Sequence, residues 1–152
     1  MKTWIWFSVF LILVGCYLWM AAPSITMGDS GELAAVGATL GVGHSPGYPL
    51  YSILGRLAVA GLPFGSGAFR MTLFSLITTC GAAVIMGMLI AELSESMLAG
   101  VLMAVLTGVS SLWLSQGITT EVFGLNSLVA ALLLYACWRQ QYLVGCLPKP
   151  KE

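Results

Sequence analysis

Residues 71–91, MTLFSLITTCGAAVIMGMLIA, decide the fold because they form an apolar run without a single charged residue. A helix needs about 20 residues to cross a hydrocarbon core of about 30 Å, and this run is that long. Similar runs predict further spans at residues 3–22, 97–116 and 122–138. We therefore predict an all-α membrane protein with about four transmembrane helices.

The composition of the whole chain agrees with this interpretation. Hydrophobic residues make up 59% of the 152 positions and charged residues only 8%, against roughly 25% charged residues in soluble domains. The formal net charge is zero, and the six Lys and Arg residues do not cluster. This pattern excludes a soluble domain and a nucleic-acid binder, because the latter needs a basic surface. Membrane lipids are the expected surroundings.

The N-terminal run has two interpretations. Lys2 and the apolar residues up to Cys16 resemble a lipoprotein cleavage box, whereas an ordinary signal peptide would end in a site of small residues. The uncharged stretch nevertheless continues to Met27, which is long enough to span the membrane. We favour an uncleaved anchor. Both interpretations place Asp29 outside the cytoplasm.

A fifth apolar stretch, residues 48–63, is short, bounded by prolines and carries Arg56 near its middle. An arginine at the centre of a span costs about 2.5–3.5 kcal/mol, which argues against crossing. Basic residues near span ends collect on the cytoplasmic side. Four spans place Lys2 there together with the C-terminal basic residues Arg139, Lys149 and Lys151. We therefore predict cytoplasmic termini and one long external loop, residues 23–69.

The spans carry small residues at helical spacing. Gly100, Ala104 and Gly108 recur every four positions in one span, and Ala83 and Gly87 do so in another. Small residues at this spacing let helix backbones approach closely. This pattern predicts helix packing rather than chemistry.

The external loop is expected to contain two helices that lie along the membrane surface. Asp29 and Glu32 have the spacing of a capping box, in which each side chain satisfies a backbone N–H at a helix start. Position adds a second interpretation, because a carboxylate at the exit of the first span can act as a general base on a lipid-linked substrate. We therefore name Asp29 and Glu32 as candidate catalytic residues and keep capping as the structural alternative.

Residues 41–49, GVGHSPGYP, predict a rigid turn between the two surface helices. His44 is the one histidine of the chain. It is either an interfacial residue satisfied by nearby backbone or a donor to a phosphate or a sugar hydroxyl. We count His44 and Tyr48, at the end of the turn, among the candidate substrate-binding residues.

Two arginines in the same loop are candidate contacts for a phosphate. Arg70 lies at the external mouth of the second span, where a guanidinium could bind a head-group phosphate through two parallel hydrogen bonds. Arg56 lies in the second surface helix. The alternative for both is that the side chain reaches the membrane interface without binding a substrate, and this alternative is favoured for Arg56.

Several segments of the chain form a combined motif: GDSGEL at 28–33, GVGHSPGYPLY at 41–51, Gly55, LPFG at 62–65, Arg70 and TEVFGLN at 120–126. Together they resemble one family of multi-span membrane proteins. That family was long known only as a domain of unknown function, includes a vertebrate protein O-mannosyltransferase of the endoplasmic reticulum, and is related to the GT-C glycosyltransferases. The family commonly has His-Pro-Pro where this chain has His44-Ser45-Pro46.

The resemblance implies a reaction and a set of roles. GT-C enzymes take a sugar from a polyprenyl-phosphate carrier on the non-cytoplasmic face, and an acidic residue of the first external loop, here Asp29, deprotonates the acceptor. Glu121 matches the place of a second acidic residue, and we add it to the candidate substrate-binding residues. GT-C cores have more spans than the four expected here. The chain is therefore interpreted as an N-terminal module, a fragment, one part of a split protein or a non-catalytic relative.

Our leading hypothesis is the N-terminal module of a glycosyltransferase that transfers a mannose-like sugar from a polyprenyl-phosphate carrier, and a second chain could supply the missing spans. The alternative is a non-catalytic membrane module that binds lipid phosphate or a partner protein. A transporter is disfavoured because the spans contain no buried charge pair. No cofactor is indicated, the cysteines lack metal-ligand spacing, and the need for a divalent metal stays open. The sugar and the acceptor also stay open.

Overall fold

The computed structural model describes residues 3–143, and every regular element in that range is a helix. The prediction of an all-α protein is confirmed. The helices in chain order are α1 (Thr3–Met20), α2 (Ser30–Thr39), α3 (Pro49–Gly61), α4 (Gly67–Leu93), α5 (Met97–Val109), α6 (Ser111–Gly117) and α7 (Phe123–Leu143). Lys2, Lys149 and Lys151, on which the predicted topology depends, lie outside the described residues.

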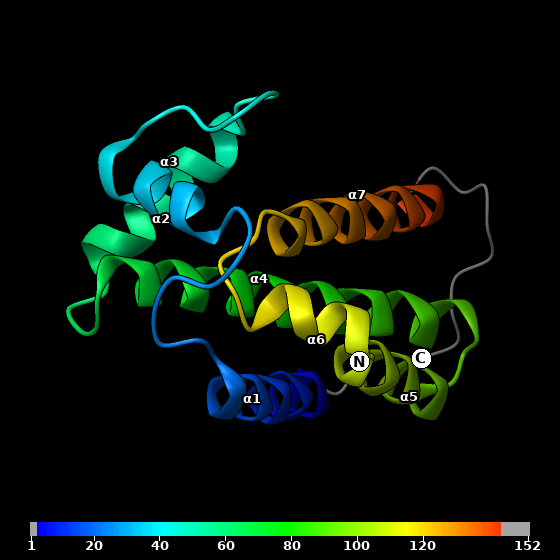
Figure 1. Cartoon of the computed structure of the whole chain (residues 1–152). Coiled ribbons are helices and arrows are strands. Elements are labelled where there is room, and N and C mark those ends of the chain that lie inside the picture. The colour runs from blue at the N-terminus through cyan, green and yellow to red at the C-terminus, as the bar shows by residue number, and fades with distance from the viewer. Residues whose placement is uncertain (1–2, 144–152) are drawn as a thin grey trace.

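The long helix α4 is the centre of the fold (Figure 1). It packs along α5 and α7 and also contacts α1, α2, α3 and α6. One buried apolar cluster joins α1, α4 and α5, and a second joins α2 and α3 to the start of α4 and to α7. The second cluster holds the α2–α3 pair on one end of α4, and this arrangement positions the candidate site.

Met71 of α4 packs against both helices of the α2–α3 pair. Met71 is fully buried, and it lies against Gly37 of α2 and Gly55 of α3. A Cβ atom on Gly55 would lie 2.7 Å from the terminal carbon of Met71 and 3.6 Å from the Cα of Gly37. The two glycines therefore leave the space that Met71 fills where the two short helices meet α4.

Small residues bring α4 and α5 into backbone contact, as the sequence predicted. A Cβ atom on Gly100 would lie 2.5 Å from the carbonyl oxygen of Gly87. A Cβ atom on Gly87 would lie 2.7 Å from both the carbonyl oxygen of Gly100 and the Cβ of Ala104. Gly108, one turn further along α5, packs against Leu13 of α1. The predicted packing role of these residues is confirmed.

Two helices, α1 and α4, are long and apolar enough to cross a membrane by length and composition, and α5 with α6 would make a third if the bent pair is one span. The chain is therefore a membrane protein. The fourth predicted span, residues 122–138, corresponds to α7 apart from its first residue, and α7 is not one of these helices. The count of four spans and the placement of the termini stay predictions.

The third predicted span differs from the expected single helix over residues 97–116. It breaks at Ser110, which is extended with a ψ of 142°, and α5 and α6 meet there at 64°. The break frees the carbonyl oxygen of Gly108, which an unbroken helix would have bonded four residues later. The buried Tyr17 hydroxyl of α1 donates to this oxygen at 2.6 Å, so the polar group stays satisfied.

Polar side chains join the C-terminal ends of α4 and α7. Glu92 accepts a hydrogen bond from the Tyr135 hydroxyl at 2.7 Å and from Arg139 at 3.2 Å. Glu92, near the end of α4, falls between the second and third predicted spans, on the side that the predicted topology assigns to the cytoplasm, and Arg139 belongs to the basic residues expected there. The contact places both residues at the same end of the helix bundle.

The two helices expected within residues 23–69 are present as α2 and α3, but the predicted capping box is wrong. Asp29 holds the N-cap position of α2 with a helical backbone, φ −80° and ψ −2°, and its side chain makes no capping hydrogen bond. Glu32 cannot complete the box because His44 occupies its carboxylate. The Asp29 carboxylate is therefore left without a capping role.

Candidate functional site

The connection between α2 and α3 folds back over the start of α2 and brings His44 to Glu32. One carboxylate oxygen of Glu32 accepts from the His44 backbone N–H at 2.5 Å, and the other contacts the ring Nδ1 at 3.0 Å. An ionised carboxylate can only accept, so Nδ1 carries the proton in this contact. Both oxygens of Glu32 are thus occupied by one residue that lies twelve positions later.

The opposite nitrogen of the His44 ring faces two further candidate residues. Nε2 lies 3.9 Å from a carboxylate oxygen of Asp29 and 3.4 Å from the Tyr48 hydroxyl. The rings of His44 and Tyr48 meet edge to face, with centroids 5.5 Å apart and planes at 82°. The structure therefore brings Asp29, Glu32, His44 and Tyr48 together. We call these four residues the acid–base cluster.

The contact between Glu32 and His44 shifts the pKa values of both residues. The hydrogen bond from His44 lowers the pKa of Glu32 below its ordinary value. The same hydrogen bond, with the charges of Glu32 and Asp29, raises the pKa of His44, although desolvation opposes the shift. At neutral pH the cluster thus favours an ionised Glu32 and a charged imidazolium more than free side chains would.

Glu121 reaches the same region from the segment between α6 and α7. Partial burial raises the pKa of its carboxyl group, and the negative charge of Asp29 raises it further. The two carboxylates thus interact although 92 positions separate them in the sequence. The resemblance had indicated Glu121 as a second acidic residue, and its role at the site stays a prediction.

Hydroxyl groups of α4 fix the backbone on which Glu121 lies. The Ser75 hydroxyl accepts from the backbone N–H of Glu121 and donates to its carbonyl oxygen, both at 3.0 Å. Thr72 contacts the Thr120 hydroxyl at 3.1 Å, and all three of Thr72, Ser75 and Thr120 are buried. The sequence interpretation missed Ser75 and Thr72. Their spacing on one face of an apolar span was the signal that could have revealed them.

The two candidate arginines lie away from the acid–base cluster. Arg56 donates to the carbonyl oxygen of Ala38 at 2.7 Å, near the end of α2. Arg70 donates to the carbonyl oxygens of Val59 at 2.7 Å and Phe64 at 3.2 Å, near the end of α3. Basic side chains often satisfy the free carbonyls at helix ends in this way. Both guanidiniums thus serve the α2–α3 fold, and their role as substrate contacts stays a prediction.

An apolar groove of about 430 Å³ begins beside the acid–base cluster. Tyr48 belongs to both the groove and the cluster, and the groove runs between the start of α3 and the start of α7. Its lining residues are Tyr48, Pro49, Leu50, Tyr51, Val122, Phe123, Leu125, Asn126 and Val129. A long apolar ligand could therefore lie in the groove with a polar end at His44.

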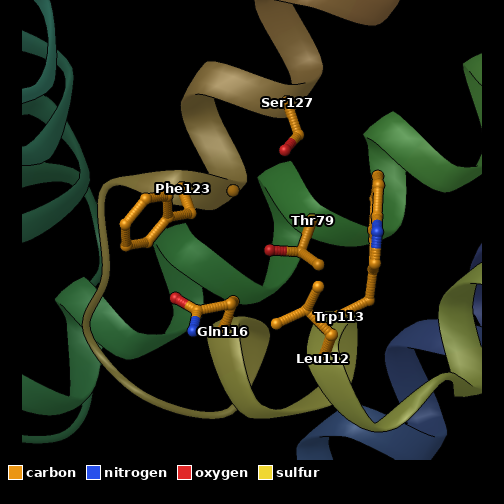
Figure 2. Close-up of a pocket in the computed structure, with 7 residues that line it drawn as sticks. Thr79, Leu112, Trp113, Gln116, Phe123 and Ser127 are labelled. Carbon is orange, nitrogen blue, oxygen red and sulfur yellow. The ribbon is translucent and has the colours of Figure 1, made fainter.

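A second cavity, of about 300 Å³, lies between α4, α6 and α7 (Figure 2). Gln116 and Trp113 of α6 face Thr79 of α4 across it, and Phe123 and Ser127 of α7 close its other side. The side-chain oxygen of Gln116 is buried there without a hydrogen-bond partner. Phe123 also lines the groove, so the two hollows share one wall.

Within residues 3–143 one group, Asp29, Glu32 and His44, could hold a metal ion by proximity, with one ligand atom of each lying within 4.8 Å of the others. Both oxygens of Glu32 already accept hydrogen bonds from His44. Nε2 of His44 and the carboxylate of Asp29 are the remaining ligand atoms. All three residues are exposed, and no metal is assigned to them.

The fold and the acid–base cluster define a helical membrane protein that presents acid–base side chains beside an apolar groove. Comparison with known proteins gives the family. Residues 29–143 match the model described as "Protein O-mannosyl-transferase TMEM260 N-terminal domain", and the chain belongs to this family. The family resemblance found in the sequence motifs is thereby confirmed.

Two relatives carry that name. The mouse protein O-mannosyl-transferase TMEM260 is 36% identical over 127 residues, which cover 84% of this chain and 18% of the mouse protein. The relative from Dictyostelium discoideum is 30% identical over 133 residues, which cover 84% of this chain and 16% of that protein. The chain thus spans less than a fifth of the length of either relative. No solved structure matches it.

Proposed function

We propose that the chain is the N-terminal membrane module of a glycosyltransferase that moves a mannose-like sugar from a polyprenyl-phosphate carrier to an acceptor on the non-cytoplasmic face. The family supports glycosyl transfer in general terms. The observation that carries the proposal is the Asp29 carboxylate, which makes no capping hydrogen bond, is 60% exposed and lies beside His44. A carboxylate in this state is available to a substrate hydroxyl.

In the proposed reaction Asp29 is the general base. The acceptor hydroxyl gives its proton to the Asp29 carboxylate, and its oxygen forms a bond to the anomeric carbon of the sugar. The bond between that carbon and the carrier phosphate breaks, and the phosphate leaves with the electron pair. The charged His44 ring and the Tyr48 hydroxyl are placed to donate hydrogen bonds to the phosphate or to sugar hydroxyls.

We propose that the carrier binds in the apolar groove. Its wall is mostly apolar, as an isoprenoid chain requires, and it begins at Tyr48, next to the ring of His44. A carrier that lay along α3 and α7 would have its phosphate at the acid–base cluster. Glu121 enters the same region, where its carboxyl group could contact the sugar. Arg56 and Arg70 would act indirectly, through the α2–α3 pair that they stabilise.

The proposal retains the topology inferred from charge. Both termini would be cytoplasmic, residues 23–69 would lie on the external face, and four spans would cross the lipid bilayer. The exposed apolar side chains of α1 and α7, such as Trp4, Ile12 and Leu133, would face lipid or further helices. Those helices would come from the remainder of a longer chain or from a second chain.

Replacement of Asp29 by Asn in a complete, active assembly tests the proposal. D29N keeps the size of the side chain but removes the base, so we expect sugar transfer to fall by about a hundredfold or more. The matched control is E95Q, which changes an exposed carboxylate in the turn between α4 and α5. Undiminished transfer by D29N at equal expression would overturn the proposal.

A further inference from the structure

Glu32 does not resemble a group that takes a proton from substrate. Its two oxygens bind two atoms of one residue, the backbone nitrogen and the ring Nδ1 of His44. From this geometry we infer that Glu32 is a positioning residue for His44. It fixes both the path of the connection between α2 and α3 and the orientation of the ring, so that Nε2 faces Asp29 and Tyr48.

The contact also determines which ring nitrogen carries the proton. The ionised Glu32 can only accept, so Nδ1 keeps its hydrogen in both charge states of the ring. In the neutral state Nε2 has a lone pair, and the Tyr48 hydroxyl, 3.4 Å away, is the donor that faces it. In the charged state Nε2 also carries a hydrogen, which faces Asp29 and Tyr48. A carboxylate that orients an imidazole in this way sets the nitrogen available for chemistry.

The groups around the ring explain why its charge matters. Asp29, Glu32 and Tyr48 face His44 directly, and Glu121 interacts with Asp29. Among the residues that the structure describes, both arginines of the α2–α3 region bind main-chain carbonyls instead. His44 thus places an ionisable ring beside the carboxylates of Asp29 and Glu32.

The catalytic consequence rests on the proposed function. The sequence alone made Glu32 a candidate catalytic residue beside Asp29. The structure instead connects Glu32 to the reaction through His44, with Asp29 as the group free to take a proton. Loss of Glu32 should therefore change how transfer depends on pH, whereas loss of Asp29 should abolish transfer at every pH.

One histidine in the chain makes a direct test possible. A protein labelled with ¹⁵N in its histidine gives the signals of His44 alone, and their shifts report which nitrogen is protonated. In the unaltered chain we expect the proton on Nδ1 above the pKa of the ring. In E32Q we expect a lower pKa and a shift of the proton toward Nε2, and E32D should retain part of the original behaviour. E95Q should leave all signals unchanged.

Two results would overturn the inference. One is a neutral His44 protonated on Nε2 in the unaltered chain, a measurement that needs no variant and so does not depend on the folding of E32Q. The other is an E32Q protein with unchanged His44 signals.

Rates of transfer in a complete assembly separate this inference from the proposed function. Transfer should fall as the pH rises and the His44 ring loses its proton. We expect E32Q to move this fall to lower pH, and a fall at the same pH in E32Q would contradict the catalytic role inferred for Glu32. Transfer that survives D29N would refute the proposed function and leave the NMR result on Glu32 standing.

Discussion

At the scale of single residues, the site depends on a carboxylate that serves a histidine rather than a helix end. A capping box would have occupied both Asp29 and Glu32. The return of His44 to Glu32 leaves Asp29 exposed at the start of α2, beside Nε2. The contact between Glu32 and His44 thus explains both why the Asp29 carboxylate is free to act as a base and why the His44 ring is oriented.

The pair of Glu32 and His44 should hold the connection between α2 and α3 most firmly in mildly acidic solution. The contact raises the pKa of His44 in the folded protein. The stability that the His44 ring contributes is therefore complete below about pH 6.5 and is lost as the pH rises through the folded-state pKa. The pKa of Glu32 is lowered in the folded protein. The stability that the Glu32 carboxylate contributes is therefore complete above about pH 4.5 and is lost as the pH falls through its folded-state pKa. Both residues contribute fully to stability between pH 4.5 and 6.5.

Proteolysis of that connection at a series of pH values, with a protease active over the whole range, measures this effect. We expect the slowest cleavage between the two limits and faster cleavage on either side, relative to a cleavage site elsewhere in the chain. H44Q should remove the dependence. A flat profile in the unaltered chain would show that the pair does not hold the connection.

Sequence patterns identified all four members of the acid–base cluster as candidates, but not how they interact. Asp29, His44 and Tyr48 stood out because charged and polar residues are rare in this chain and because turn residues surround them. The contact between Glu32 and His44 was not predictable, since it depends on the three-dimensional path of a loop rich in glycine and proline. Capping was the local alternative for Glu32, and a contact twelve positions away displaced it.

At the scale of the helices, the break at Ser110 was missed because residues 97–116 have no proline or charged residue to indicate it. The partner of the break, Tyr17, lies in another span. Its hydroxyl donates a hydrogen bond to the carbonyl oxygen of Gly108, which the bend leaves without a partner in the helix. The tertiary contact thus satisfies a carbonyl at the bend, which falls in a stretch with glycine and serine, residues at which helices often kink.

Removal of the Tyr17 hydroxyl should destabilise the bend. Y17F leaves the carbonyl oxygen of Gly108 buried without a donor, so we expect a loss of about 1–3 kcal/mol in the free energy of unfolding. Reversible unfolding in detergent measures it. S8A, on an exposed part of the same helix, is the control and should change little. Equal stability of Y17F and S8A would mean that the hydroxyl does not stabilise the bend.

Gly100 should not tolerate a methyl group, because α4 and α5 touch through their backbones there. A Cβ atom would lie 2.5 Å from the carbonyl oxygen of Gly87, which cannot move aside as a side chain could. We expect G100A to lower the free energy of unfolding by about 1–3 kcal/mol. G15A is the matched control, since no atom lies within 4 Å of a Cβ at that position. A G100A protein as stable as G15A would contradict the close packing.

At the scale of the whole molecule, composition was enough to indicate a helical membrane protein, and small-residue spacing was enough to indicate how α4 and α5 pack. Composition was not enough to count spans. By length and composition α1 and α4 qualify, and α5 with α6 only as a bent pair. The start of α7 carries Asn126 and Ser127, and its end carries Arg139. Such residues reduce the apolar signal of a helix that packs along α4.

The relatives of this chain are much longer proteins. The chain corresponds to less than a fifth of the mouse and Dictyostelium relatives, and its matched region begins at Asp29, the proposed base. A module of this size would supply the acid–base cluster and one wall of the carrier site. Other helices would enclose the lipid and bind the acceptor.

An exchange of segments tests most directly whether this module supplies the base. The segment of the mouse relative that matches this chain is replaced by this chain, and sugar transfer is measured in membranes at equal expression, with and without D29N. We predict that the chimera transfers sugar, that its E95Q form does so equally, and that its D29N form does not. A D29N chimera that transfers sugar as fast as the unaltered chimera would contradict the account.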